Sequence, residues 1–228
     1  MIQAQNNRVK AVIFDYDGTI LDSMGAWHTL ERDLAQRANI TLDAAEKSRL
    51  NACTLSQLVA YFHNTYGVGE SYDALFEEAR AQLLNEYHNE IQPKKGALEL
   101  LARLKDDGVK LALASASPLF LIEAGLKRFN IHHIFDVIAS ADQENTSKQN
   151  PRFLQAVAQS LDSKTCDMWG IDDSVYALDV MNHLGFSTIG IYDSDAAGSL
   201  SELQKSANFA VRALSDLDYE TFINDGYA

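Results

Sequence analysis

Short apolar runs alternate with amphipathic segments along most of the chain. Residues 11–14 are continuously apolar, which is typical of a strand buried on both faces of a parallel sheet. From residue 93 onward, similar runs recur between segments whose apolar residues fall three or four positions apart, as on one face of a helix. These further runs predict strands at 110–115, 136–139, 166–171 and 187–191. Strands that alternate with helices predict an α/β fold with a doubly wound, Rossmann-like parallel sheet.

Residues 24–92 break this alternation because they contain helical patterns only. One of these patterns begins at Thr54–Gln57, whose residue types form a capping box at the start of a helix. The segment is far longer than a crossover between two parallel strands requires. We therefore expect an all-helical cap domain over 24–92, inserted into an α/β core made of 1–23 and 93–228.

The charge of the 228-residue chain narrows its range of partners. It has 32 acidic and 19 basic residues, a formal net charge of −13, and so should repel nucleic acid and anionic membranes. Cys53 and Cys166 form no CxxC motif and are expected to be free thiols. The polar start and the lack of a long apolar run suggest neither a signal peptide nor a membrane span. We expect a cytoplasmic protein with no obligate protein partner.

Polar clusters follow the predicted strands, where open parallel sheets bind their ligands. The candidates are Asp15-Tyr16-Asp17-Gly18-Thr19, Ser115-Ala116-Ser117, Lys148 just before Pro151, and Asp172-Asp173. Asp15 and Asp17 could divide labour, one attacking or binding a metal while the other moves a proton. Asp172 and Asp173 would repel each other unless a hard cation such as Mg²⁺ lies beside them.

Each cluster also has an ordinary structural interpretation. An Asp-Gly pair such as Asp17-Gly18 commonly forms a turn after a strand. Ser117 fits the N-cap of a helix that begins near Pro118, and Asp173 or Ser174 fits the N-cap of the next one. A single lysine is usually just solvated. The clusters therefore indicate a functional site only when they are considered together.

Together and in this order, the clusters resemble the haloacid dehalogenase-like superfamily of phosphohydrolases. The DYDGT motif at 15–19, after an apolar strand, is its most specific part. Lys148 stands three residues before Pro151, as in the family's Lys-x-x-Pro arrangement, although Gln149 replaces a proline that many members have. The resemblance covers almost the whole chain, because the helical insert falls where members with a type I cap carry theirs.

The resemblance implies a Mg²⁺-dependent phosphatase that hydrolyses a small phosphorylated metabolite through an aspartyl phosphate. Asp15 would attack phosphorus. Asp17 would protonate the leaving oxygen and then deprotonate the attacking water. Asp15, the backbone carbonyl of Asp17, and Asp173 would hold Mg²⁺, with Asp172 in support.

The resemblance also implies a group of residues that bind the phosphoryl group, namely Thr19, Ser115, Ala116 and Lys148. Thr19 would position Asp17, while Ser115 and Lys148 would hold the group during its transfer. Phosphoryl transfer depends mainly on positioning and charge neutralisation, which such residues supply. Lys148 and the cation would also offset the negative charge of the chain.

Two other functions are compatible with the sequence. The stretch 114–117 resembles sugar phosphomutases of the β-phosphoglucomutase type, but those enzymes carry histidine where this chain has Trp27, and Thr19 also departs from their pattern. The other alternative is a catalytically silent regulatory protein that binds metal or phosphate. The presence of every candidate catalytic residue argues against it. Specificity would come from the cap, where the candidates are Trp27, His28, Tyr61 and His63.

Overall fold

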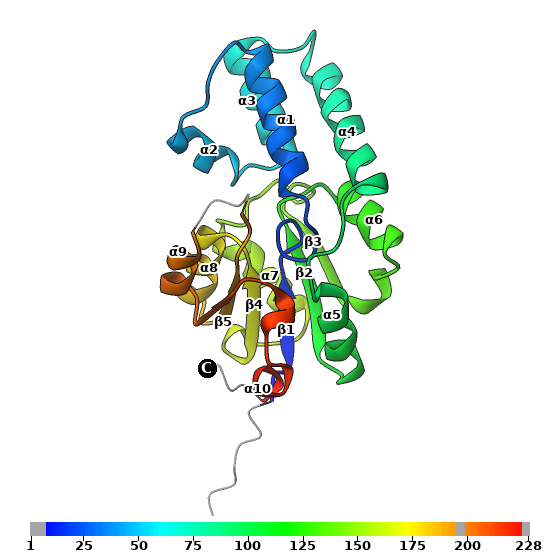
Figure 1. The fold of residues 1–228 in the computed structure, drawn as a ribbon, viewed down its shortest axis with the longest axis vertical. Helices are drawn as coiled ribbons and strands as arrows, with labels where there is room; N and C mark the ends of the chain where they lie inside the picture. The colour runs from blue at the N-terminus through cyan, green and yellow to red at the C-terminus, as the bar shows by residue number, and fades with distance from the viewer. Residues whose placement is uncertain (1–7, 195–198, 225–228) are drawn as a thin grey trace, which may run out of the picture.

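A parallel β-sheet forms the centre of the molecule in the computed structural model, which describes residues 8–194 and 199–224 (Figure 1). Its strands are β1 (Ala11–Phe14), β2 (Lys110–Ser115), β3 (Val137–Ser140), β4 (Met168–Asp172), β5 (Ser187–Ile191) and β6 (Phe209–Val211). Their order across the sheet is β3-β2-β1-β4-β5-β6, so the chain starts in the middle, builds one side, and then builds the other. The predicted doubly wound parallel sheet is confirmed, and its switch point lies between β1 and β4.

Helices connect the strands and cover both faces of the sheet (Figure 1). They are α1 (Met24–Arg37), α2 (Ala44–Leu50), α3 (Leu55–Tyr66), α4 (Tyr72–Asn89), α5 (Ala97–Asp106), α6 (Leu119–Arg128), α7 (Pro151–Ser160), α8 (Val175–His183), α9 (Leu200–Ser206) and α10 (Tyr219–Ile223). The predicted capping box at the start of α3 is present, because the Thr54 side chain accepts from the Gln57 N–H and the Gln57 side chain from the Thr54 N–H.

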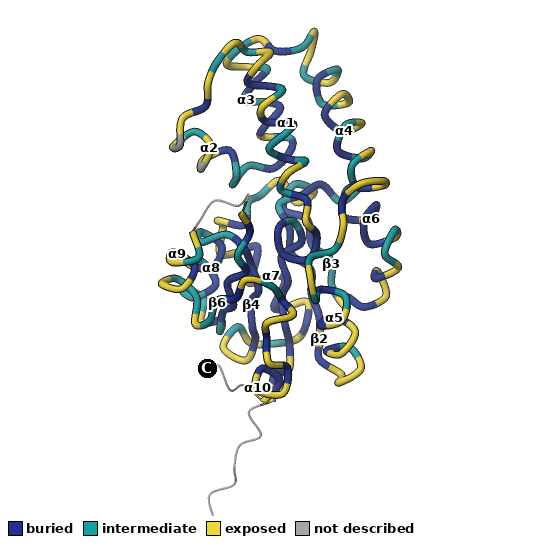
Figure 2. Tube along the Cα trace, viewed as in Figure 1, coloured by how far each residue is buried: buried dark blue, intermediate teal, exposed yellow. Residues whose placement is uncertain are grey.

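Alternating side chains of the strands build two hydrophobic cores, one on each face of the sheet. Val12 and Phe14 belong to the larger core, which extends into α5, α6 and α10. Ala11 and Ile13 face the other way, into a smaller core with α7 and α8. Figure 2 shows the central strands as almost continuously buried, which is the reason for their unbroken apolar runs, whereas β3 and β6 at the two sides of the sheet are buried only in part.

The helices of residues 24–92 lie above the carboxyl ends of the strands (Figure 1). We refer to α1–α4 as the cap helices. The two segments that join them to the rest of the chain run side by side, with the Asp22 N–H donating to Gln92 at 2.9 Å and the Lys94 N–H to Ile20 at 2.8 Å. Arg128 of α6 also donates to the carbonyl of Asn89, at the end of α4, at 2.9 Å. The division into a cap domain over 24–92 and a core over 1–23 and 93–228 stays a prediction.

Across the described ranges, 8–194 and 199–224, no helix combines the length and the apolar character needed to cross a lipid bilayer.

Candidate active site

The sheet brings the predicted clusters together at one edge. β1 lies between β2 and β4, so Asp15 at the end of β1 has Ser115 on one side and Asp172 on the other. The Asp15 N–H donates to the Ile171 carbonyl at 2.9 Å, which continues the ladder between β1 and β4 to the start of the site. This edge is the switch point of the strand order, where open α/β sheets bind their ligands.

Gly18 is required by both the turn and the site. Its φ is +80°, a conformation that other residues rarely adopt. A Cβ at this position would lie 2.1 Å from Oδ2 of Asp173, so any side chain would displace that carboxylate. The glycine of the DYDGT motif therefore lets β1 turn sharply and leaves room for Asp173.

Buried charges crowd the end of β1. Asp15, Asp172, Asp173 and Lys148 are 5%, 0%, 3% and 2% exposed. Ligand oxygens of the three carboxylates all lie within 4.8 Å of one another. The Lys148 ammonium lies 2.7 Å from Oδ1 of Asp15 and also contacts Asp172. One ammonium cannot neutralise three buried carboxylates, so the cluster carries an excess of negative charge.

This excess changes the proton affinities of the cluster. Burial raises the pKa of Asp15 to about 7; Lys148 opposes this rise and Asp172 adds to it. Burial and the charges of Asp15 and Asp172 raise the pKa of Asp173 well above its usual value. Burial alone would lower the pKa of Lys148, but Asp15 and Asp172 outweigh it and hold that pKa well above its usual value. Lys148 is therefore charged.

A divalent cation would balance this cluster. Carboxylate oxygens are the ligands that Mg²⁺ prefers, and such a cation would replace protons on Asp15 and Asp173. Asp172 is less free to bind it, because its oxygens already accept from Lys148 and, at 2.9 Å, from the Ser174 N–H. The donor set thus fits a cation held by Asp15 and Asp173, with Asp172 in support.

Hydroxyl groups hold the Asp17 carboxylate away from this cluster. Its Oδ1 accepts from Ser23 Oγ at 2.6 Å and from the Tyr87 hydroxyl. Its Oδ2 accepts from Ser117 Oγ at 2.5 Å and more weakly from Ser115 Oγ at 3.4 Å. Ser23 directly precedes α1, Tyr87 lies on α4, Ser115 ends β2, and Ser117 lies in the loop after β2. Asp17 is therefore fixed by both the sheet and a cap helix. Its carboxylate is occupied by these hydrogen bonds, so its backbone carbonyl is the group left to bind Mg²⁺, as expected.

Trp27 and Tyr87 extend this network into the cap helices. The Trp27 indole N–H donates to the Tyr87 hydroxyl at 3.1 Å. Tyr87 is fully buried, and burial together with the Asp17 charge raises its pKa well above the usual value. Its hydroxyl therefore stays protonated and donates a hydrogen bond to Asp17. The Trp27 N–H is therefore the first donor of a hydrogen-bonded chain that ends on Asp17.

Replacing Tyr87 with phenylalanine should lower kcat roughly 10-fold, because a hydrogen bond to a charged group contributes about 1.5–3 kcal/mol. The ring that stacks on Tyr16 is retained, so the fold should survive. Steady-state kinetics with p-nitrophenyl phosphate would measure the effect. The matched control is Tyr66→Phe, which removes a cap hydroxyl that bonds to Tyr61 instead. Equal kcat values for Tyr87→Phe and the wild type would contradict this role for Tyr87.

The structure corrects two of the expected roles. Thr19 is fully buried, and its hydroxyl has no hydrogen-bond partner within the described part of the chain, so it does not hold Asp17. The backbone folds back after Gly18, with the Leu21 N–H donating to Tyr16, and this turn encloses Thr19. Ser117 does not cap a helix either, since α6 begins at Leu119 after Pro118, and its hydroxyl is directed at Asp17.

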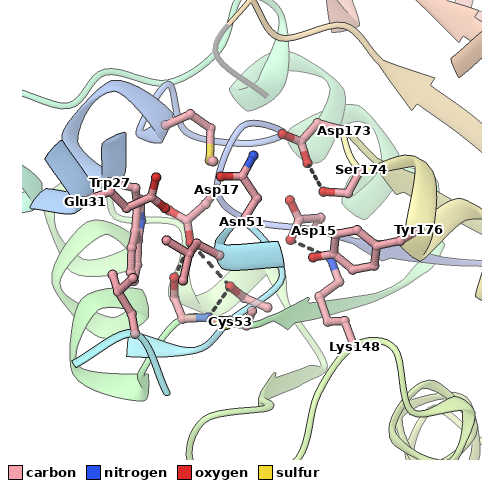
Figure 3. A pocket seen from close by; sticks show the side chains of 16 residues that line it. Asp15, Asp17, Trp27, Glu31, Asn51, Cys53, Lys148, Asp173, Ser174 and Tyr176 are labelled. Atoms are coloured by element: carbon pink, nitrogen blue, oxygen red, sulfur yellow. Dashed lines mark hydrogen bonds and ion pairs between the residues drawn. The ribbon is translucent and has the colours of Figure 1, made fainter. Parts of the chain in front are cut away.

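A pocket opens between the sheet edge and the cap helices (Figure 3). Asp15, Asp17, Ser115, Ala116, Lys148 and Asp173 line its floor. Of the four predicted specificity residues, Trp27 lines it, whereas His28, Tyr61 and His63 do not. Tyr61 bonds to Tyr66 at 3.1 Å and His63 to the Val68 carbonyl at 2.9 Å, so both have roles within the cap.

Glu31 is a pocket residue that the sequence analysis missed. It lies one helical turn after Trp27 on the buried face of α1 and is 6% exposed. No hydrogen bond or ion pair joins it to another described residue. Burial raises its pKa to about 7, which Lys47 opposes only in part. A charged residue at an apolar position of an amphipathic helix was the available signal.

Glu31 should make the protein less stable as the pH rises. Its pKa of about 7 in the folded state exceeds the usual 4.5, so folding retains a proton that the unfolded chain releases. The penalty is absent below pH 4.5 and complete above pH 7. Glu31→Gln should therefore melt roughly 5 °C above the wild type at about pH 8, and close to it at about pH 5. Thermal melts would contradict this if the difference were the same at both pH values.

Comparison with known proteins agrees with this geometry. Residues 12–191 match the haloacid dehalogenase-like hydrolase family. Hexitol phosphatase B of Escherichia coli K12 is 31% identical over 176 residues, covering 74% of this chain and 77% of that protein. The β-phosphoglucomutase of Bacillus subtilis is 24% identical over 222 residues, 93% of both chains. The crystal structure of β-phosphoglucomutase from Clostridium difficile superposes with a TM-score of 0.77 at 24% identity, covering 96% of this chain and 97% of that one.

The fold, together with the cluster of carboxylates at the carboxyl ends of the strands, defines a protein of the phosphatase and phosphoglucomutase type. The chain belongs to the haloacid dehalogenase-like hydrolases, as its motifs indicated.

Proposed function

We propose that the protein is a Mg²⁺-dependent phosphoric monoester hydrolase that acts through an aspartyl phosphate on Asp15. The observation that carries this proposal is the placement of two carboxylates in one pocket. Asp15 lies beside Lys148 and Asp173, where a phosphoryl group and a cation can be neutralised. Asp17 faces the same pocket but is held by hydroxyl groups, apart from the charged cluster.

The first half-reaction would transfer the phosphoryl group to Asp15. Lys148 contacts Oδ1 of Asp15, which leaves Oδ2 to attack phosphorus. For this step Asp17 must enter protonated: the bond from phosphorus to the leaving oxygen breaks, and that oxygen takes the proton from Asp17, which is left as a carboxylate. The ammonium of Lys148 and hydroxyl of Ser115 would bind the phosphoryl oxygens, beside Ala116 in the pocket wall.

The second half-reaction would return Asp15 to its starting state. Asp17, now a carboxylate, takes a proton from water, and the water oxygen attacks phosphorus as the bond to Asp15 breaks. Inorganic phosphate leaves. When bound by Asp15, Asp173 and the Asp17 carbonyl, Mg²⁺ would neutralise charge on the phosphoryl group.

The substrate is proposed to be a small phosphorylated metabolite. The relative named hexitol phosphatase B supports a substrate of this kind. We also propose that the enzyme works in the cytoplasm without a nucleic acid, membrane or obligate protein partner. The net charge of −13 and the free Cys53 and Cys166 support this setting.

A phosphatase assay tests the proposed function. The purified chain should release p-nitrophenol from p-nitrophenyl phosphate in the presence of MgCl₂. The Asp17→Asn variant, purified and assayed in the same way, should retain little activity. Its amide cannot donate and accept the transferred proton as a carboxyl group can. A well-folded protein with no hydrolysis of this or any other phosphomonoester would favour a regulatory protein that binds metal or phosphate.

Sugar phosphomutase activity is a second candidate, supported by the 24% identity with β-phosphoglucomutase over 93% of the chain. Both enzymes would form the same aspartyl phosphate, so they differ in the acceptor that Asp17 activates. Trp27, where such mutases carry histidine, bonds to Tyr87 and offers no imidazole to the acceptor. We therefore expect β-glucose 1-phosphate, if it reacts, to yield inorganic phosphate. Faster formation of glucose 6-phosphate than of phosphate would instead establish a mutase.

A further inference from the structure

Tyr176 lines the pocket beside the charged cluster, yet it takes no part in the steps assigned to Asp15, Asp17 and Lys148. We propose that Tyr176 is a further catalytic residue, whose hydroxyl donates a hydrogen bond to a non-bridging oxygen of the phosphoryl group during its transfer to and from Asp15. A phenol hydroxyl suits this task because it donates without bringing a charge. This inference rests on the proposed phosphatase function and adds a residue to its site.

The start of α8 places Tyr176 at the same edge of the sheet as the carboxylates. β4 ends at Asp172, and α8 begins at Val175 after a short connection, so Tyr176 lies on the first turn of this helix. Figure 3 shows its ring reaching from that turn toward Asp15 and the end of the Lys148 side chain. The charges of Lys148 and Asp15 both act on the tyrosine, which agrees with this placement.

The Tyr176 hydroxyl is unpaired and can be reached by a ligand. No hydrogen bond joins it to another residue within 8–194 or 199–224. Over the same ranges, the enclosed side-chain oxygens that lack a partner are those of Thr19 and Asn51, and the Tyr176 hydroxyl is not one of them. The residue as a whole is only half-buried. Its donor is therefore open to the pocket that it lines, unlike that of Tyr87, which bonds to Asp17.

The surroundings of Tyr176 keep its hydroxyl protonated, as a hydrogen-bond donor requires. Burial raises its pKa well above the usual value; Lys148 opposes this rise, and the three carboxylates of the cluster add to it. A neutral phenol adds no negative charge to a cluster that already carries an excess. It can therefore face a phosphoryl group without repelling it.

Few side-chain donors are free to bind the phosphoryl group. Its three non-bridging oxygens carry the charge of the transition state. The Lys148 ammonium has three N–H donors, and its contacts with Asp15 and Asp172 occupy two of them. The hydroxyl of Ser115, at the end of β2, lies 3.4 Å from the Asp17 carboxylate. Tyr176 adds a donor from α8, so side chains of separate elements would hold the phosphoryl oxygens.

Tyr176→Phe tests this inference, because it removes the hydroxyl and keeps the ring. With Mg²⁺ present, kcat/KM for p-nitrophenyl phosphate should fall roughly 10-fold. The Ki of orthovanadate, which mimics the transferring phosphoryl group, should rise by a similar factor. The Mg²⁺ concentration for half-maximal activity should stay the same, since the hydroxyl is not a metal ligand in this proposal.

The matched control is Tyr72→Phe, which makes the same change on the first turn of α4. The Tyr72 ring stacks on Phe76 with centroids 6.0 Å apart, and it does not line the pocket. This variant should keep the wild-type kcat/KM and the wild-type Ki. A crystal structure with Mg²⁺ and orthovanadate should place the Tyr176 hydroxyl about 2.7 Å from a vanadate oxygen.

The outcomes separate this inference from the proposed function. Hydrolysis by Tyr176→Phe with wild-type kcat/KM and Ki would overturn the inference and leave the proposed function standing. So would a lower kcat/KM with an unchanged Ki, or a higher Mg²⁺ requirement of the same size, because the hydroxyl would then act elsewhere. A hydroxyl bonded to Lys148 in the orthovanadate complex would also contradict it. No hydrolysis by the folded wild type would refute the proposed function, and the inference with it.

Discussion

Asp15→Asn will lower kcat by at least about 1,000-fold, because the amide is a poor nucleophile and the covalent route is lost. The variant should still fold. The neutral amide removes one of three crowded carboxylates, and Lys148 keeps its contact with Asp172. Phosphate release and circular dichroism of the same preparation measure the two effects.

A matched control for this variant is Asp106→Asn, at an exposed position on α5 outside the pocket. It makes the same chemical change at a distance from the site and should keep wild-type activity. Residual activity of Asp15→Asn above about a tenth of wild type would refute the nucleophile assignment, since loss of a covalent catalyst has a far larger effect.

Removal of divalent cations will abolish activity, and added Mg²⁺ will restore it. Asp173→Ala should raise the Mg²⁺ concentration for half-maximal activity roughly 10-fold or more, because Mg²⁺ has few protein ligands. That concentration should also rise in the wild type as the pH falls below about 7, since protons then compete for Asp15, whose pKa is about 7.

Activity titrations with MgCl₂ after EDTA treatment, at several pH values, provide these numbers. Full activity in EDTA would contradict the dependence on a cation. A titration curve of Asp173→Ala identical to that of the wild type would show that Asp173 only accommodates the turn at Gly18 and the hydroxyl of Ser174.

The sequence was sufficient to predict the parallel sheet, because its central strands are buried on both faces and read as unbroken apolar runs. The edge strand β6 was missed, since its three residues, Phe209–Val211, are too short for a pattern. The short helices α2, α9 and α10 were missed for the same reason. These elements depend on packing against the rest of the molecule more than on their own periodicity.

The charged part of the site was predictable because strand order brings strand ends together. Asp15, Asp172, Asp173 and Lys148 converge as the motifs indicated. The partners of Asp17 were not predictable in the same way. Tyr87 lies 70 positions along the chain from Asp17, and at helical spacing it looks like any other packing residue. Such contacts are set by how α4 docks onto the sheet, which local patterns do not encode.

The central claim is that Asp15 carries the phosphoryl group during turnover. Acid quenching during steady-state hydrolysis of a radiolabelled phosphomonoester, followed by proteolysis and mass spectrometry, tests it directly. The account predicts label on the peptide that contains Asp15, sensitive to hydroxylamine as an acyl phosphate is, and absent in Asp15→Asn. Label on another residue, or rapid release of phosphate with no labelled protein in the wild type and undiminished turnover in Asp15→Asn, would contradict it.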